Sequence, residues 1–146
     1  PLQVTTMMAA IANNGIKNAP AIVDAVVDNE TGKVVQTMSR AKPTMILGTE
    51  TVKKLQEMLR EVTVTGTAKQ ANLDEFGGSS GKTSSAETGI QSGSIVHGWF
   101  AGYTPSDNPQ YAITVMVYNG KSGGKSAAPL FREIAYRIFT EYKPVK

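Results

Sequence analysis

Three segments typical of β-strands, residues 81–87, 95–103 and 111–118, follow one another with short connections in the second half of the 146-residue chain. The connection before residue 111 is the turn-forming run TPSDNP at 104–109. Strands joined this tightly pair antiparallel, because a parallel pair needs a crossover of about a dozen residues or more. The segment YAITVMVY at 111–118 is apolar at both alternating sets of positions. It therefore predicts a central strand that is covered on both faces.

Helical patterns flank these strands. Apolar side chains recur at helical spacing between Pro1 and Asn13, again from Thr49 to Val62, and in a last segment that begins near Pro129. Between the first two helices, the β-branched runs at 22–27 and 33–37 flank a turn and predict a hairpin. Helices that pack on an antiparallel sheet make an α+β fold.

Composition excludes several classes of site. The chain has no Cys, so it has no disulfide, no cysteine zinc site and no thiol nucleophile. His97 is its only His, and no carboxylate cluster lies near it in sequence, so we expect no metal and no cofactor. The 15 Lys and Arg residues are scattered and exceed the 12 acidic residues by only three, which gives no support for nucleic-acid binding.

Two glycine-rich segments, 77–83 and 120–126, resemble the phosphate-binding loop G-x-x-x-x-G-K-[ST]. Both lack its first Gly, because Phe76 and Asn119 stand at that position. The spacing matters, since successive backbone N–H groups must wrap one phosphate. A nucleotide-binding domain is an alternative function, but the missing first Gly in both segments argues against it.

Two short motifs suggest serine chemistry. Ser79-Ser80-Gly81-Lys82 spells S-x-x-K, and Ser106-Asp107-Asn108 spells S-D-N. A nucleophilic Ser and its Lys must share one face of a helix at positions i and i+3, but the glycines around 79–82 disfavour a helix there. The second motif lies within a turn that has Pro at either end. We predict that neither motif is catalytic in this chain.

The neighbouring segment Lys82-Thr83-Ser84-Ser85 differs, because its surroundings match a known family as well. GKTSSAE at 81–87 resembles the GKTGTAE strand of penicillin-binding protein transpeptidases, and HGWFAGYTP at 97–105 is similar to the HAWFVGYAP type of that family's next strand. Three more blocks resemble the family, namely PLQ at 1–3 with MAAIANNG at 8–15, VTGTA at 64–68, and AAPLF at 127–131. The blocks occur in family order and span nearly the whole chain.

The resemblance implies a partial penicillin-binding protein transpeptidase fold, of which the complete form has a helical region and a five-stranded antiparallel sheet. Residues 1–146 would be the C-terminal portion of that domain. The family's catalytic Ser-x-x-Lys and Ser-x-Asn lie N-terminal to all these blocks, so the part with the nucleophile would be missing. A fragment is also expected because Pro1 stands at the first turn of a predicted helix and leaves no residue for an N-cap.

By the family pattern, Lys82 and Ser85 would be catalytic, and Thr83, Ser84 and Ser85 would bind substrate. Lys82 would direct positive charge toward the terminal carboxylate of the substrate. The hydroxyls of Thr83 and Ser85 would hydrogen-bond that carboxylate or the acid group of a β-lactam. The backbone N–H of Ser85 would be an oxyanion-hole donor. Ser84 departs from the pattern, which has a Gly that lets the strand approach the nucleophile closely.

The same resemblance implies a function and its partners. The whole protein would be a serine D,D-transpeptidase that cross-links peptidoglycan stem peptides and binds β-lactams, with the N-terminal half of the same protein as structural partner. An N-terminal membrane anchor, missing from this chain, would hold it at the extracytoplasmic face of the bacterial cell membrane. A non-catalytic β-lactam sensor domain, which shares the same strand, is the alternative.

Overall fold

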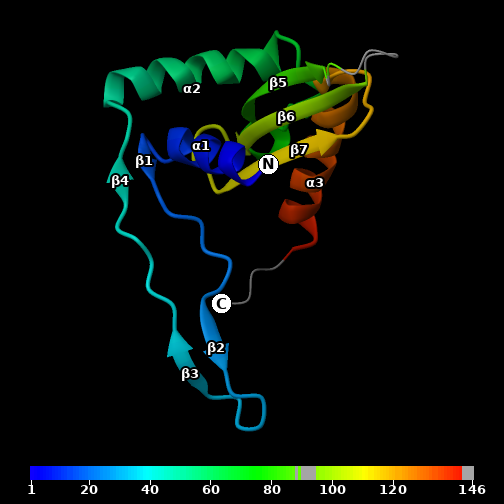
Figure 1. Ribbon diagram of the computed structural model, residues 1–146. Coiled ribbons are helices and arrows are strands. Elements are labelled where there is room, and N and C mark those ends of the chain that lie inside the picture. The colour runs from blue at the N-terminus through cyan, green and yellow to red at the C-terminus, as the bar shows by residue number, and fades with distance from the viewer. Residues whose placement is uncertain (88, 90–94, 143–146) are drawn as a thin grey trace.

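Helices cover both faces of a three-stranded sheet in the body of the computed structural model, which describes residues 1–87, 89 and 95–142 (Figure 1). The elements of the body are α1 (Leu2–Ala12), α2 (Thr49–Val64), β5 (Ser80–Glu87), β6 (Val96–Thr104), β7 (Tyr111–Val117) and α3 (Ala128–Thr140). Between α2 and β5 the chain makes two short 3-10 turns, Lys69–Ala71 and Asp74–Phe76. A π-helical turn, Gly123–Ala127, leads into α3.

The strand order is β5-β6-β7, and both pairs are antiparallel. The predicted α+β class and antiparallel pairing are confirmed. The prediction for 111–118 was half wrong. Helices α1 and α3 contact β7 from its two faces, as expected, but the central strand of the described sheet is β6. The two apolar faces of β7 are therefore explained by the two helices that pack on them. Apolar residues on both faces of a strand do not indicate how many strands pair with it.

Two clusters make the core, one on each face of the sheet. On the α3 face, Phe100 and Val115 pack with Phe131 and Ala135, and the rings of Phe100 and Phe131 meet edge to face at 4.7 Å. On the α1 face, Ala101 and Tyr103 pack with Met8 and Ile11. Alternation along β6 explains the division, because successive side chains of a strand point to opposite faces. We call the face that packs on α3 the α3 face of the sheet and the face that packs on α1 the α1 face.

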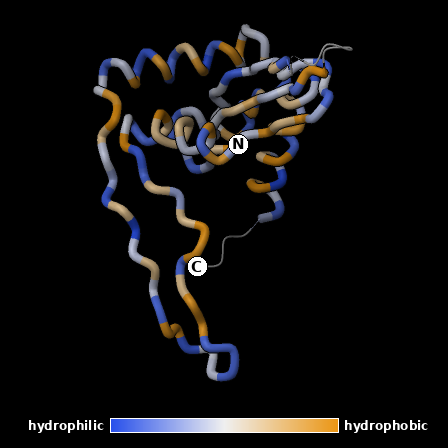
Figure 2. Tube along the Cα trace, viewed as in Figure 1, coloured by the Kyte–Doolittle hydropathy of each residue, from blue (hydrophilic) through white to orange (hydrophobic). Residues whose placement is uncertain are grey.

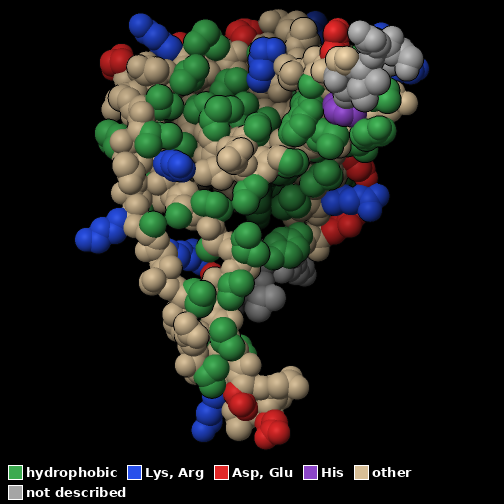
Figure 3. Space-filling model, in the orientation of Figure 1, with side chains coloured by type: hydrophobic (Ala, Val, Ile, Leu, Met, Phe, Trp, Pro, Cys, Tyr) green, Lys and Arg blue, Asp and Glu red, His purple; other side chains and the backbone are tan. Residues whose placement is uncertain are grey.

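An arm of the chain, residues 16–46, runs away from the body (Figure 1). At its base β1 (Ile16–Lys17) pairs with β4 (Thr44–Met45), and farther out β2 (Ala25–Val27) pairs with β3 (Val34–Thr37), which confirms the predicted hairpin. Apolar residues follow the arm and many are exposed, as Figures 2 and 3 show. Among the described helices, none has the length and apolar character needed to cross a bilayer.

Candidate functional site

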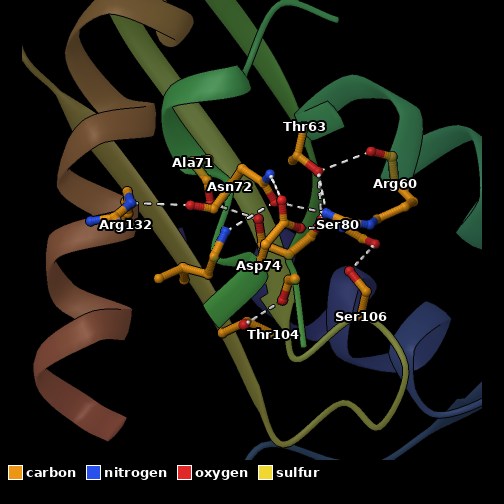
Figure 4. A network of polar contacts seen from close by, with 12 residues as sticks. Arg60, Thr63, Ala71, Asn72, Asp74, Ser80, Thr104, Ser106 and Arg132 are labelled. Carbon is orange, nitrogen blue, oxygen red and sulfur yellow. Dashed lines mark hydrogen bonds and ion pairs between the residues drawn. The ribbon is translucent and has the colours of Figure 1, made fainter. Parts of the chain in front are cut away.

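A polar network holds the start of β5 against α2 (Figure 4). Arg60 of α2 donates hydrogen bonds to the carbonyl oxygen of Ser79 at 3.1 Å and to Asn72 Oδ1 at 2.8 Å. It also pairs with Asp74 at 2.6 Å, and this hydrogen bond, with one from Asn72, holds the pKa of the Asp74 carboxyl below its usual value. Thr63, which is fully buried, donates to the same Ser79 oxygen at 2.6 Å. These hydrogen bonds therefore fix the position of the start of β5 relative to α2.

The two serine motifs predicted to be non-catalytic are structural parts of this region. Ser79 is fully buried, and its Oγ donates to the carbonyl oxygen of Ala71 at 2.6 Å. The hydroxyls of Ser80 and Ser106 hydrogen-bond each other at 2.9 Å, which ties the β6–β7 turn to the start of β5. A buried hydroxyl that is already bonded to the backbone cannot attack a substrate, so Ser79 is excluded as a nucleophile in this conformation.

The chain spells S-x-x-K twice more. Ser39 to Lys42 lies in the irregular part of the arm. Ser122 to Lys125 begins in extended backbone at Ser122, whose Oγ accepts a hydrogen bond from the Lys125 N–H at 3.2 Å. Neither Ser stands on an α-helix with its Lys one turn later, which is the arrangement that a nucleophile and its base require.

The predicted site residues all lie on β5, but on two different faces. Lys82 and Ser84 stand opposite Ala101 and Trp99 of β6, on the α1 face. Thr83 and Ser85 stand opposite Phe100 and Gly98, on the α3 face. The structure therefore brings Thr83 and Ser85 together and separates both from Lys82 and Ser84. Within the described part of the chain β5 pairs with β6 alone, so its other edge has no strand partner there, although α2 contacts β5.

Thr83 and Ser85 lie in a groove of about 420 Å³ on the α3 face. We call it the basic groove, and its lining residues are Gly66, Thr67, Lys69, Gln70, Thr83, Ser85, Ser122, Gly123, Gly124 and Lys125. The hydroxyls of Thr67 and Thr83 hydrogen-bond each other at 2.7 Å, and Ser85 Oγ accepts a long bond of 3.4 Å from the Gly123 N–H. Two lysines and several hydroxyls line it without an acidic residue, which suits a carboxylate ligand.

Two glycines close one side of this groove by direct backbone contact. A Cβ atom added to Gly123 would overlap the carbonyl oxygen of Trp99 and would lie 2.6 Å from that of Ser84. A Cβ on Gly124 would overlap the carbonyl oxygen of Thr67. Gly123 and Gly124 of the segment 120–126 thus pack against protein backbone. Segment 77–83, the other candidate phosphate loop, runs into a strand. Neither segment has the arrangement of a phosphate-binding loop.

On the α1 face, a second groove of about 360 Å³ runs between β5 and α1. We call it the apolar groove, and its lining residues are Val4, Met7, Met8, Lys82, Thr83, Ser84, Ala86, Trp99 and Ala101. The Lys82 side chain is exposed, and its Nζ donates to the carbonyl oxygen of Thr83 at 3.0 Å. None of the ion pairs found among residues 1–87, 89 and 95–142 involves Lys82. Its charge is therefore held beside β5 without an acidic partner from the described chain.

His97 has an ordinary structural role. Its Nδ1 accepts a hydrogen bond from the Asn119 N–H at 3.3 Å, and its ring lies 4.7 Å from that of Tyr118. Across the residues that the structure describes, no group of three potential metal-ligating side chains comes together.

Comparison with known proteins places this geometry in context. A family model described as the penicillin binding protein transpeptidase domain matches residues 1–136. Stage V sporulation protein D of Bacillus subtilis is 29% identical over 142 residues, which are 92% of this chain and 22% of that protein. The peptidoglycan D,D-transpeptidase MrdA of Haemophilus influenzae is 26% identical over 151 residues, which cover 92% of this chain and 23% of that protein. The chain thus spans between a fifth and a quarter of the length of these curated relatives.

A solved structure has the same fold. Penicillin-binding protein A of Mycobacterium tuberculosis, solved as an imipenem acyl-enzyme complex, matches with a TM-score of 0.80 at 24% identity. The match covers 96% of this chain and 32% of that one.

Proposed function

This chain belongs to the penicillin-binding protein transpeptidase family, and from that premise we propose that it is part of a serine D,D-transpeptidase of the bacterial cell wall. Residues 1–146 form the C-terminal portion of the transpeptidase domain, and the nucleophilic serine lies in the N-terminal part. We call the protein with both parts the whole protein. An N-terminal anchor holds it at the extracytoplasmic face of the cell membrane.

One observation carries the proposal: Thr83 and Ser85 of β5 place two hydroxyls in a groove that also contains Lys69 and Lys125. A stem peptide ends in a carboxylate, and a β-lactam carries an acid group that resembles it. The hydroxyls donate hydrogen bonds to that carboxylate and thereby fix the ligand along the strand. Binding in this position presents the scissile carbonyl to a serine supplied by the N-terminal part.

The reaction proceeds through a covalent acyl-enzyme. The serine oxygen attacks the carbonyl of the penultimate residue, a bond to the serine forms, and the terminal amino acid leaves with a proton. The amine of a second stem peptide then attacks the ester, forms the cross-link and releases the serine. The Ser85 N–H stabilises the oxyanion of each tetrahedral intermediate, and Lys82 supplies positive charge from the opposite face of β5. A β-lactam enters the same first step, but its opened ring stays attached.

The chain of 146 residues alone should form no covalent adduct with a β-lactam. Ser79 is buried and bonded to Ala71, and no helical S-x-x-K stands in the described residues. We would incubate this chain and the whole protein with a fluorescent penicillin and separate them by denaturing electrophoresis. We expect a labelled band from the whole protein only. A band from the short chain that disappears in Ser79→Ala or Ser122→Ala would contradict the assignment.

Turnover separates the enzyme from the alternative sensor domain. An enzyme releases the terminal D-amino acid from a stem peptide repeatedly when an acceptor amine is present. A sensor is acylated by the β-lactam but releases no such product. We expect repeated release by the whole protein.

A further inference from the structure

Two lysines line the basic groove in addition to the hydroxyls that the proposed reaction uses. Lys69 comes from the 3-10 turn that follows α2, and Lys125 comes from the π-helical turn that precedes α3. Both are exposed, and neither forms any of the ion pairs found in the described residues. Two like charges on one groove are unfavourable unless an anion lies between or beside them.

The backbones that carry these lysines are fixed relative to each other. Gly124, next to Lys125, packs so closely on the carbonyl oxygen of Thr67 that a Cβ would not fit. The Lys125 N–H is bonded to Ser122 Oγ at 3.2 Å, and the Lys69 carbonyl accepts from the Asn72 N–H at 3.2 Å. Direct contact between the two turns therefore holds both lysine backbones on the same groove.

One carboxylate does not need all these donors. Thr83 and Ser85 already offer a hydroxyl each to a terminal carboxylate, and the groove, at about 420 Å³, has room for more than one such group. The lysines are cations without an acidic partner in the groove lining, and they border the position assigned to the terminal carboxylate. Their charge suits a second acidic group on the same peptide or on the second peptide that enters the reaction.

We propose that Lys69 and Lys125 form a second carboxylate-binding position, so that the enzyme prefers stem peptides with a free side-chain carboxylate over the same peptides with that group amidated. The inference rests on the proposed function, because it needs the terminal carboxylate at Thr83 and Ser85. The acidic group can belong to the donor peptide or to the acceptor peptide. The chemistry of recognition is the same in both cases, and the experiment separates them.

The expected preference is modest, because both lysines are exposed to solvent. An exposed ion pair changes binding by up to about fivefold, so two lysines together give a preference of roughly five- to twentyfold at low salt. Screening shortens the reach of such charges to about 10 Å at 0.1 M salt. The preference should therefore shrink as the salt concentration rises.

The test uses the whole protein with matched peptides that differ only in one side chain, a free carboxylate or its primary amide. In one arm each peptide is the donor with a neutral amine acceptor. In the other arm each peptide is the acceptor with one fixed donor. The ratio of kcat/KM for the acid and the amide form is measured in the wild type and in Lys69→Gln, Lys125→Gln and Lys121→Gln. Lys121 lies in the same loop as Lys125 but outside the groove lining, so Lys121→Gln is the charge-matched control.

We expect the wild type to prefer the acid form in at least one arm, and that arm identifies the source of the carboxylate. Lys69→Gln and Lys125→Gln should each lower the acid-to-amide ratio of kcat/KM about three- to fivefold, toward a value of one. Lys121→Gln should leave the ratio at its wild-type value. Two results would contradict the second carboxylate-binding position. One is equal kcat/KM for the acid and the amide form in both arms, and the other is a fall of the acid-to-amide ratio in Lys121→Gln as large as in Lys69→Gln or Lys125→Gln. Labelling by fluorescent penicillin and peptide turnover are read in parallel. If both persist while the preference is absent, the proposed function stands and this inference fails, and if both are absent, both fail.

Discussion

Lys82→Ala in the whole protein should slow acylation by a β-lactam roughly 30- to 1,000-fold, which corresponds to about 2–4 kcal/mol of transition-state binding. Lys82 carries a positive charge beside β5, and its Nζ reaches the carbonyl oxygen of Thr83 at 3.0 Å. Lys82 takes part in none of the ion pairs found in the described residues, so in the proposed reaction its charge is available to the substrate and to the groups that activate the serine. The second-order rate of labelling by a fluorescent penicillin measures the effect.

Two control variants separate charge from packing. Lys82 lines the apolar groove, so its aliphatic stem also covers apolar surface. Lys82→Met keeps most of that stem and removes only the charge, and we expect the same loss as in Lys82→Ala. Lys54→Ala removes a lysine from the exposed surface of α2 and should leave the rate unchanged. Acylation of both Lys82 variants within a factor of a few of the wild type would mean that Lys82 is an ordinary surface lysine.

Gly123→Ala should disturb both the stability and the activity of the whole protein. The new Cβ would overlap the Trp99 carbonyl oxygen and would lie 2.6 Å and 2.8 Å from the Ser84 oxygen and nitrogen. All three are backbone atoms of β5 and β6, so they cannot move aside as a flexible side chain could. The turn would have to lift from β5, which we expect to lower the free energy of unfolding by about 1–3 kcal/mol. Thermal and denaturant unfolding measure this loss.

The same substitution should slow acylation, because the Gly123 N–H contacts Ser85 Oγ and the turn closes one side of the basic groove. Gly48→Ala is the matched control, since nothing lies within 4 Å of a Cβ at that position. It should be neutral in both assays. If Gly123→Ala retained wild-type stability and wild-type acylation, the close packing of this turn on β5 would be unimportant.

Much of the fold could be predicted from local patterns. The short connection at 104–109 required antiparallel neighbours, and the period of apolar residues located α2. Burial along α3 was less predictable. Phe131, Ile134 and Ala135 recur at helical spacing along α3, yet Phe131 and Ala135 are buried whereas Ile134 is 42% exposed. Periodicity gives the direction of a side chain, and only the neighbouring elements decide whether anything covers it.

The candidate site was predictable in its residues and less so in its arrangement. Motif resemblance selected Lys82, Thr83, Ser84 and Ser85 as a group. The structure places adjacent members on opposite faces of β5, because successive side chains of a strand alternate. Lys69 and Lys125 could not have been found in the same way. They share a groove because Gly124 packs on Thr67, a tertiary contact with no local sequence signal.

The most direct test of the account is a crystal structure of the whole protein acylated by benzylpenicillin. We expect the acyl group on a serine outside residues 1–146, and the carboxylate of the opened drug in the basic groove, within hydrogen-bond distance of Thr83 Oγ1 and Ser85 Oγ. An acyl group on Ser79 or Ser122, or a drug carboxylate held away from β5, would contradict the central claim that this strand forms the carboxylate-binding side of the transpeptidase cleft.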